Sequence, residues 1–195
     1  MKSYGGHYLL STELRQLGCR SVGEDVRIHS TCVLVGMENL SIGSHVRVDP
    51  FCSLIAAAGS IIIGDYVHIS SQALLFGSEG IEISDFVNLS AGTRFYSRNE
   101  DYTGRTLTGP AIPEVYRKPE RGRVTVRRHV IVGSGSVVLP GVDIAEGSVV
   151  GALSLVKSSL APWGIYAGIP ARRLRDRERA VLEFEQQLRA AEYKP

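Results

Sequence analysis

An aliphatic residue recurs at every sixth position through most of the chain, and this period constrains the fold more than any other feature. Written in sixes, the sequence contains VGEDVR-IHSTCV, IGSHVR-VDPFCS and IGDYVH-ISSQAL, then resumes after an interruption as VRRHVI-VGSGSV and IAEGSV-VGALSL. Three hexapeptides make one triangular coil, and coils stack at about 4.8 Å per rung because none can bury its inner face alone. The sequence therefore predicts an all-β parallel β-helix whose coils begin at Val22, Ile42, Ile63, Ile83, Val126 and Ile144.

The fifth position of each hexapeptide holds a small side chain, as the tight corner of such a coil requires. Cys32 and Cys52 occupy this position one rung apart, so their sulfur atoms are expected to fill the core. An antiparallel sandwich would need hairpin dipeptides such as Asn-Gly, which are missing. Amphipathic helices would need a period of about 3.6, which occurs only near the two ends. The corner column comprises Val26, Cys32, Val46, Cys52, Ala58, Val67, Ala73, Val87, Thr93, Val130, Ser136, Val142, Ser148 and Ser154.

The chain divides into a solenoid and two ends. A short helix from Ser11 to Leu17, stopped by Gly18, is expected to cap the open first coil. A second helix, packed on the solenoid or on a neighbouring subunit, is expected to carry an apolar stripe of Leu174, Val181, Phe184 and Leu188. The predicted parts are an N-terminal cap over residues 1–20, a β-helix over 21–171 with a projecting loop at 99–124, and a C-terminal helix over 172–195.

The composition excludes several classes of protein. The 195 residues suffice for one domain with a real core, and a formal net charge of +2 gives no sign of nucleic-acid binding. No apolar run approaches the ~18 residues that a membrane span needs, and MKSYGGHYLL lacks the apolar stretch of a signal peptide. Three cysteines without a CxxC motif suit a reducing compartment, so a cytoplasmic location is expected.

The repeat resembles the hexapeptide-repeat acyltransferase superfamily over residues ~20–172. The segment VVLPGVDIAEGSVVGALSLVKSSLAPWGIYAGIPARRLRDR matches the late coils of that superfamily and its terminal GxPA[RK] signature, here Gly168-Ile169-Pro170-Ala171-Arg172. FYSRNEDYTGRTLTGPAIP lies where many members project a catalytic loop, and it is similar to acetyltransferases of surface polysaccharides. The resemblance implies a left-handed coil, a homotrimer and active sites in the grooves between subunits. The hand rests on resemblance alone, because about 98% of parallel crossovers are right-handed.

The resemblance also implies acetyl-CoA as the co-substrate, and the late coils offer residues that suit it. Small residues there would let the pantetheine arm approach the backbone, and basic residues beyond them would bind the phosphates. The expected coenzyme residues are Ser134, Gly135, Gly151, Ala152, Lys157, Pro170, Arg172 and Arg173. No metal is expected, because no three histidines have the spacing of the zinc-binding carbonic anhydrases that share this fold.

The catalytic base is less clear than the coenzyme site. Xenobiotic relatives carry Asn-His-Arg-Met-Asp-Gly in the projecting loop, whereas this chain has Asn99-Glu100-Asp101-Tyr102-Thr103-Gly104. The loop histidine is absent, which leaves Glu100 and Asp101 as its possible replacements. A third candidate is His68, which is expected in an outward polar column with Arg47 and Asn88. That column either lines the groove or is simply solvated.

The loop supplies candidate groups for binding the substrate. Asn99 and Tyr102 offer hydrogen bonds and a ring that suit a sugar, and Arg47 and Asn88 are assigned to the same role. The basic return limb, with Arg117, Lys118, Arg121 and Arg123, either binds the phosphates of a nucleotide-linked sugar or is a solvated turn. Without a loop histidine an amino acceptor gains weight over a hydroxyl, because an amine needs less help from a base.

Two functions from different classes follow. The first is an acetyl-CoA-dependent transferase that acetylates an amino or hydroxyl group of a nucleotide-linked sugar for surface polysaccharide or lipopolysaccharide biosynthesis. The second is a non-catalytic hexapeptide-repeat scaffold or binding protein that has lost the loop histidine. The GIPAR segment and the polar loop favour the enzyme.

Overall fold

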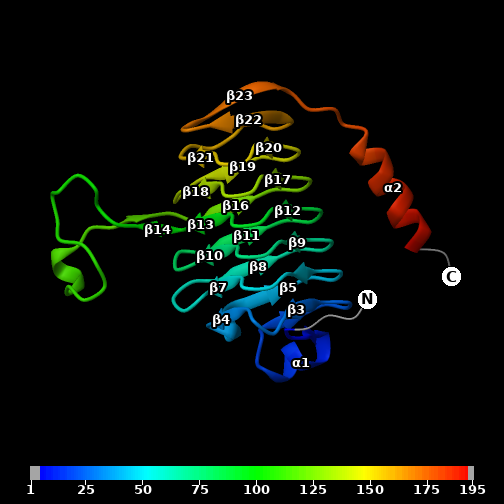
Figure 1. Cartoon of the computed structure of the whole chain (residues 1–195), viewed down its shortest axis with the longest axis horizontal. Coiled ribbons are helices and arrows are strands. Elements are labelled where there is room, and N and C mark those ends of the chain that lie inside the picture. The colour runs from blue at the N-terminus through cyan, green and yellow to red at the C-terminus, as the bar shows by residue number, and fades with distance from the viewer. Residues whose placement is uncertain (1–4, 193–195) are drawn as a thin grey trace.

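The computed structural model describes residues 5–192, and its body is a left-handed parallel β-helix with three flat faces, as predicted (Figure 1). Sheet A contains β1 (Tyr8–Leu10), β3 (Arg27–His29), β6 (Arg47–Val48), β9 (His68–Ile69), β12 (Asn88–Leu89), β17 (Ile131–Val132), β20 (Val149–Val150), β22 (Gly164–Gly168) and β23 (Ala171–Asp176). Sheet B contains β2 (Ser21–Val22), β5 (Leu40–Ile42), β8 (Ile61–Ile63), β11 (Ile81–Ile83), β16 (Val124–Val126) and β19 (Asp143–Ile144). Sheet C contains β4 (Val33–Val35), β7 (Ser53–Ile55), β10 (Leu74–Phe76), β13 (Arg94–Tyr96), β18 (Val137–Val138) and β21 (Leu155–Val156).

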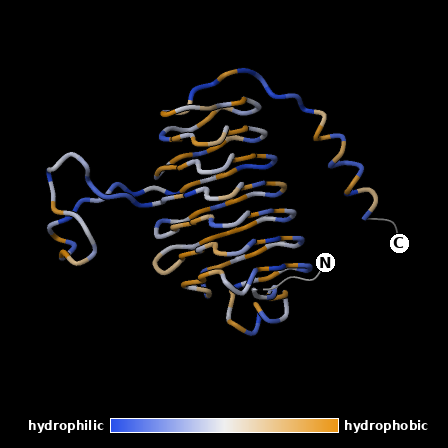
Figure 2. The backbone as a smooth tube through the Cα atoms, viewed as in Figure 1, coloured by the Kyte–Doolittle hydropathy of each residue, from blue (hydrophilic) through white to orange (hydrophobic). Residues whose placement is uncertain are grey.

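The coils stack in the predicted register. The six expected coil starts pair one on the next through sheet B, from Val22 to Ile144. Their side chains and those of the facing sheets form one continuous core. Hydrophobic residues recur along the stacked coils, as the orange segments of the backbone trace in Figure 2 show. The small corner residues are also inside, with Cys52 fully buried and Cys32 half-buried. Ala58 is an exception, because the extra residues of its turn expose it and Ala56 is buried in its place.

The N-terminal end closes the first coil. Helix α1 (Ser11–Gln16) ends one residue before the predicted Leu17 and buries Leu14 completely against the core. Strand β1, which the sequence pattern does not reveal, pairs antiparallel with β3 and extends sheet A by one strand. Residues 1–4 of the predicted cap lie outside the described residues.

The predicted C-terminal helix is wrong over its first part. Residues 171–176 form β23, which pairs antiparallel with β22 and covers the last parallel edge of sheet A. An uncovered edge would leave a row of unpaired N–H and C=O groups, so pairing outweighs the helical pattern there. Helix α2 (Val181–Glu192) follows and packs on the solenoid, while Leu174 lies on the strand and is exposed. Residues 193–195 lie outside the described part of the chain.

The loop leaves the solenoid after sheet C one residue before the predicted start at 99, and it ends one residue before the predicted end at 124. Its stalk is the antiparallel pair β14 (Arg98–Asn99) and β15 (Glu120–Arg121), and the chain rejoins sheet B at β16. In Figure 1 the loop projects far to the left of the coils, whereas α2 hangs on the right.

Candidate active site

The outward column predicted on sheet A is present. Arg47, His68 and Asn88 are paired in register on β6, β9 and β12, and Ile131 continues the column on β17. The Nδ1 atom of His68 lies 3.2 Å from Oδ1 of Asn88. The imidazole therefore lies beside the amide of Asn88 on the next rung.

Asp49, which the sequence analysis missed, organises this column. Its side chain is 12% exposed and accepts hydrogen bonds from Nε of Arg47 at 2.7 Å, Nε2 of His68 at 2.9 Å and the hydroxyl of Tyr8 at 3.1 Å. Burial by itself would raise the pKa of Asp49, but the hydrogen bonds from His68, Arg47 and Tyr8 outweigh burial and lower it. The signal for Asp49 is the alternation of the strand, since it stands two residues after outward Arg47.

The Asp49–His68 pair can act as a proton acceptor. With its proton on Nε2 and donated to Asp49, His68 presents an unprotonated Nδ1. Once Nδ1 has taken a proton, it can donate that proton to Oδ1 of Asn88, so an oxygen atom faces each nitrogen of the imidazolium. The proton of the neutral ring belongs on Nε2, because the ionised carboxylate of Asp49 can only accept a hydrogen bond. Such an arrangement suits a general base, with Asp49 orienting the ring.

The small residues expected to bind the coenzyme lie on the same face, higher up the solenoid. Each residue of a second outward column donates its N–H to the carbonyl of the next rung, and this column runs through Asp49, Ser70, Ser90, Gly133 and Gly151. Ser134, Gly135 and Ala152 lie in the turns that follow. The glycines also have a packing role, because a Cβ on Gly151 would lie 3.0 Å from Cβ of Ala167. The second column is therefore polar at its lower end and has no side chain at Gly133 and Gly151, whereas the first column continues above Asn88 with aliphatic Ile131, Val149 and Ile165.

The basic residues beyond the last coil differ in whether a described acidic or hydroxyl group already binds them. The guanidinium of Arg173 is held by the hydroxyl of Tyr166 at 2.9 Å and by Asp176 at 2.7 Å. Lys157 and Arg172 are exposed and form no ion pair with any described residue. Pro170 follows a cis peptide bond in the hairpin between β22 and β23. Of these residues, Lys157 and Arg172 are the cations available to a phosphate.

Asp101 is occupied with the structure of the loop. Its carboxylate accepts hydrogen bonds from the backbone and hydroxyl groups of Thr103 and Thr106 and from the N–H of Arg105. The bonds from Thr103 and Thr106 lower its pKa to about 2. A carboxylate with so low a pKa and so many donors is a poor base at neutral pH. The geometry thus assigns Asp101 to the fold of the loop.

Glu100 has a different environment at the base of the loop. It borders a cavity of about 460 Å³ between the stalk and sheet C, together with Arg98, Asn99, Arg117 and Tyr96. Oε1 of Glu100 lies 3.8 Å from Arg117, whereas its Oε2 is buried and has no hydrogen-bond partner among the described residues. Nη2 of Arg98 and Nε of Arg117 are also buried without a hydrogen bond. A polar ligand in this cavity would satisfy these atoms.

Of the other expected loop residues, Asn99 lines this cavity and Tyr102 lies outside it. The hydroxyl of Tyr102 donates a 2.9 Å hydrogen bond to Oδ1 of Asn99, and the Tyr102 ring is exposed. The phosphate-binding alternative for the return limb loses support, because Arg121 pairs with Glu79 and Glu114 and Arg123 pairs with Glu82. These ion pairs neutralise much of the charge on the return limb.

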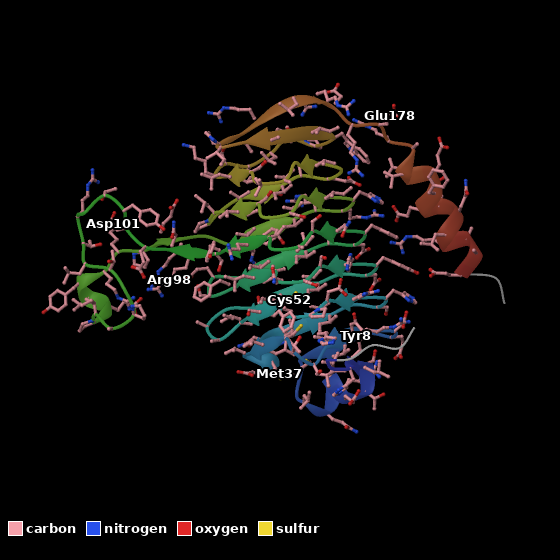
Figure 3. The ribbon with its side chains drawn as sticks, in the orientation of Figure 1. Tyr8, Met37, Cys52, Arg98, Asp101 and Glu178 are labelled. Carbon is pink, nitrogen blue, oxygen red and sulfur yellow. The ribbon has the colours of Figure 1, made fainter. Side chains whose placement is uncertain are left out.

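Within a single chain, the projecting loop and the face of sheet A that carries His68 lie on opposite sides of the solenoid. Figure 3 shows Asp101 and Arg98 on the projecting loop at the left, and Tyr8, the hydrogen-bond partner of Asp49, on the opposite side of the coils. A site that used both would need loop and face from different subunits.

Two absences concern the described residues only. Residues 5–192 contain no cluster of three or more His, Cys, Asp and Glu side chains arranged to hold a metal ion. Neither helix within this range has the length and apolar character needed to cross a membrane.

Three relatives resemble the chain over most of its length. It is 40% identical over 178 residues to the dTDP-4-amino-4,6-dideoxy-D-glucose acyltransferase of Escherichia coli, covering 91% of this chain and 93% of that protein. It is 28% identical over 166 residues to WbbJ of Escherichia coli K12, a putative O-acetyl transferase of lipopolysaccharide biosynthesis, covering 84% and 82%. No family model matches the chain.

The third relative is AntD, an N-acyltransferase from Bacillus cereus. Its complex with dTDP and 3-hydroxybutyryl-CoA superposes with a TM-score of 0.93 at 38% identity, over 97% of this chain and 100% of that one. A point mutant of AntD in complex with dTDP-4-amino-4,6-dideoxyglucose and coenzyme A superposes with a TM-score of 0.92 at 38% identity, over 96% and 100%.

Proposed function

Because the chain belongs to the hexapeptide-repeat acyltransferases and resembles relatives that act on or bind dTDP-linked amino sugars, we propose that it transfers an acyl group from coenzyme A to the amino group of such a sugar nucleotide. The superfamily expected from the repeat is thereby confirmed. The observation that carries the proposal is the match to AntD over the whole solenoid, loop included. The similarity to WbbJ supports a role in the synthesis of a surface polysaccharide. We place the reaction in the cytoplasm, in keeping with three cysteines that form no disulfide.

The proposed reaction is an aminolysis of a thioester. The lone pair of the sugar amine attacks the carbonyl carbon, a C–N bond forms, and the C–S bond breaks. Coenzyme A leaves as a thiolate that takes up a proton, and the amine nitrogen loses one. We assign acceptance of the amine proton to Nδ1 of His68, because Asp49 fixes the ring and Asn88 can accept from the protonated nitrogen.

We propose that the substrate is shared between subunits of a homotrimer. The loop of one subunit would then face the sheet A column of its neighbour, which reconciles their separation in a single chain. The unpaired Oε2 of Glu100 would accept a hydrogen bond from the sugar, with Asn99 and Tyr102 beside it. Arg47 and Asn88 would contact the sugar from the opposite wall.

For coenzyme A we propose a path along sheet A from the hairpin of β22 and β23 down to His68. The pantetheine arm would lie over Ser134, Gly135, Gly151 and Ala152, where few side chains obstruct the backbone. Lys157 and Arg172 would hold the phosphates as unpaired cations, whereas Arg173 and Pro170 would shape the hairpin that carries Arg172.

The test is an acyl-transfer assay with purified protein, acetyl-CoA and dTDP-4-amino-4,6-dideoxyglucose, followed by release of the coenzyme A thiol. Turnover is expected, with a product heavier by one acetyl group, and His68→Ala should lower kcat at least about tenfold without loss of folding. A dTDP sugar with a hydroxyl in place of the amine is the control for O-acetylation. If neither acceptor supports thiol release, the transferase is refuted and the non-catalytic scaffold takes its place.

A further inference from the structure

Helix α2 lies against a ladder of aromatic rings at the corner between sheets B and A. Each ring comes from a corner residue with a positive φ between 54° and 60°. The first four rings stack on one another from rung to rung, whereas Trp163 lies two rungs beyond His129 and is tilted against it, with Gly147 at the corner between them. Successive centroids are 4.7, 4.9, 5.2 and 6.4 Å apart. The ladder consists of His45, Tyr66, Phe86, His129 and Trp163.

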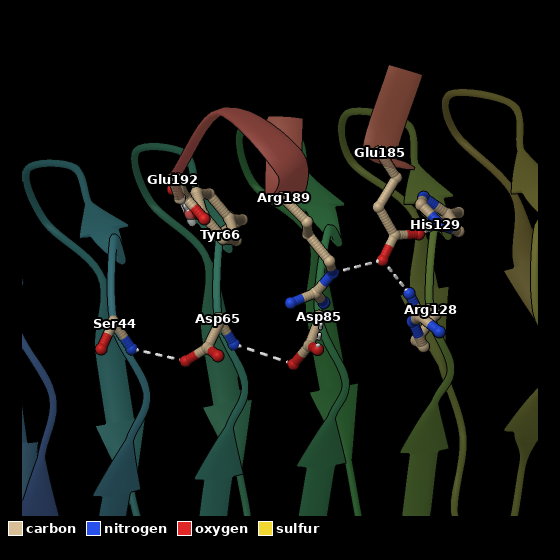
Figure 4. Close-up of polar contacts among 9 residues, drawn as sticks. All are labelled: Ser44, Asp65, Tyr66, Asp85, Arg128, His129, Glu185, Arg189 and Glu192. Carbon is tan, nitrogen blue, oxygen red and sulfur yellow. Dashed lines mark hydrogen bonds and ion pairs between the residues drawn. The ribbon is translucent and has the colours of Figure 1, made fainter. Parts of the chain in front are cut away.

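Polar contacts hold the helix on this ladder, as Figure 4 shows. Glu185 accepts hydrogen bonds from His129 at 2.7 Å and from Arg189 at 2.8 Å, and it pairs with Arg128. Arg189 also reaches Asp85 at 3.3 Å. The Glu185 carboxylate is therefore fully engaged in holding the helix on the solenoid, whereas Nε of Arg128 is buried without a hydrogen bond to any described residue.

A cavity of about 350 Å³ remains between α2 and sheet A. Its walls are apolar, with Phe86 and Ile131 from the solenoid and Val181, Phe184 and Leu188 from the helix. Its edge is polar, because His68 and Asn88 also line it. Arg177 lines the cavity as well, but its guanidinium already donates to the carbonyls of His129 and Gly147 at 2.6 and 3.0 Å.

This cavity differs in character from the cavity at the base of the loop. There, buried atoms of Arg98, Glu100 and Arg117 lack partners and suit a polar ligand. Beneath α2, the charged residues Arg177 and Glu185 already have hydrogen-bond partners. A ligand in this cavity would therefore contact mainly apolar side-chain atoms. Apolar walls with a few polar groups at one end are typical of a small-molecule site, and about 350 Å³ lies within the usual range of ~300–1,000 Å³.

We propose that the cavity beneath α2 receives the acyl chain of the donor thioester and selects acyl groups longer than acetyl. This inference rests on the proposed transferase and on His68 as its base. The carbonyl carbon must lie near His68 for the amine proton to reach Nδ1, and the cavity begins at that side chain. A chain that extends from this carbon past Asn88 meets Ile131 on one side and Leu188 on the other.

The size of the preference follows from the buried methylene groups. Burying one methylene is worth a factor of about four in affinity, so two additional methylenes predict that kcat/KM is about 16-fold higher for butyryl-CoA than for acetyl-CoA. Filling the cavity should remove this advantage, because the longer chain then has no place to bind.

The experiment compares acetyl-, butyryl- and hexanoyl-CoA with the same amino-sugar acceptor in the wild type and in three variants. Leu188→Trp and Val181→Trp fill the cavity from two positions on α2, and either should lower the ratio of kcat/KM for butyryl-CoA to that for acetyl-CoA toward one. Gln187→Trp places the same side chain on the exposed surface of α2, outside the cavity, and should keep the wild-type ratio. Circular dichroism checks that each variant is folded.

Equal kcat/KM for the three donors in the wild type would overturn the proposal, as would an equal loss of the ratio in Leu188→Trp and Gln187→Trp. Turnover with acetyl-CoA but no dependence on chain length would refute the cavity and leave the transferase intact. If no thioester is consumed at all, the transferase fails. Calorimetric titration with butyryl-CoA and acetyl-CoA then still tests the cavity, because only butyryl-CoA should lose affinity in Leu188→Trp, and unchanged affinity would reject it.

Discussion

Asp49→Asn tests how the His68 face works. The substitution keeps the shape of a side chain that is 12% exposed, but it removes the negative charge and replaces one acceptor oxygen by an NH2 group. That group would face the Nε of Arg47, the Nε2–H of His68 or the hydroxyl of Tyr8, all of which donate to Asp49 in the wild type. His68 then loses the charged acceptor that keeps its proton on Nε2.

The expected loss follows from the hydrogen bond to a charged group. Such a bond contributes about 1.5–3 kcal/mol, which corresponds to roughly a 10- to 150-fold lower kcat/KM. Because Asp49 acts through His68, kcat should fall while KM for the sugar nucleotide changes little. The double variant Asp49→Asn/His68→Ala should be no slower than His68→Ala alone, since a positioning residue has no effect without the base it positions.

The assay is kcat/KM measured from pH 5 to 9, with chemical unfolding run beside it. The pKa of Asp49 is depressed in the folded protein, so its contribution is fully present above the unfolded value of about 3.9 and is lost as pH falls through the folded value. Any loss of activity between pH 8 and 5 therefore comes from another group. Asp143→Asn is the matched control, because Asp143 pairs with Arg127 at 2.7 Å on sheet B. Wild-type kcat/KM in Asp49→Asn would refute the role given to this carboxylate.

Three further predictions concern the other parts of the molecule. Arg172→Ala should raise KM for acyl-CoA about tenfold at constant kcat, and an unchanged KM would remove Arg172 from the phosphate site. Asp101→Ala should speed cleavage of the loop by a protease while the unfolding midpoint of the solenoid stays constant, because Asp101 bonds only within the loop. A cleavage rate equal to that of the wild type would contradict this. Glu185→Gln should release α2 and cost about 1–3 kcal/mol of local stability, measured by hydrogen exchange of α2. Burial raises the pKa of Glu185, but the hydrogen bonds from Arg189 and His129 outweigh burial, so its pKa in the folded protein is lowered. The wild-type contact should therefore hold above the unfolded value of about 4.3 and open only as pH falls below it. Opening between pH 7 and 5 would contradict this.

The solenoid could be predicted from the sequence because one rule repeats in every coil. Inward aliphatic residues and small corner residues recur, so a single error of register would disrupt the whole pattern. The pairing from Val22 to Ile144 confirms the rule, and the exposed Ala58 shows where inserted residues break it. Repetition thus makes local patterns reliable for this fold.

The ends and the site could be predicted only in part, because they depend on partners rather than on period. Residues 172–176 have a helical pattern, but they pair with the open edge of sheet A and form β23 with Ala171. Asp101 and Glu100 are adjacent acidic residues that sequence alone cannot tell apart. Only the folded loop shows that one carboxylate is fully hydrogen-bonded and that the other has a buried oxygen without a partner.

The architecture of the β-helix explains why the candidate functional side chains lie on its outer faces, its corners and its insertion. In a coil this narrow every inward position is taken by the core, so functional groups can come only from outward columns, corners and insertions. His68 and Asp49 belong to neighbouring outward columns, α2 rests on a corner, and Glu100 lies in the insertion. Because stacking fixes each outward column to one face, these groups cannot be rearranged within a chain. A site that combines the loop with the His68 face must therefore be assembled by packing solenoids side by side, and a solenoid with flat faces is suited to that.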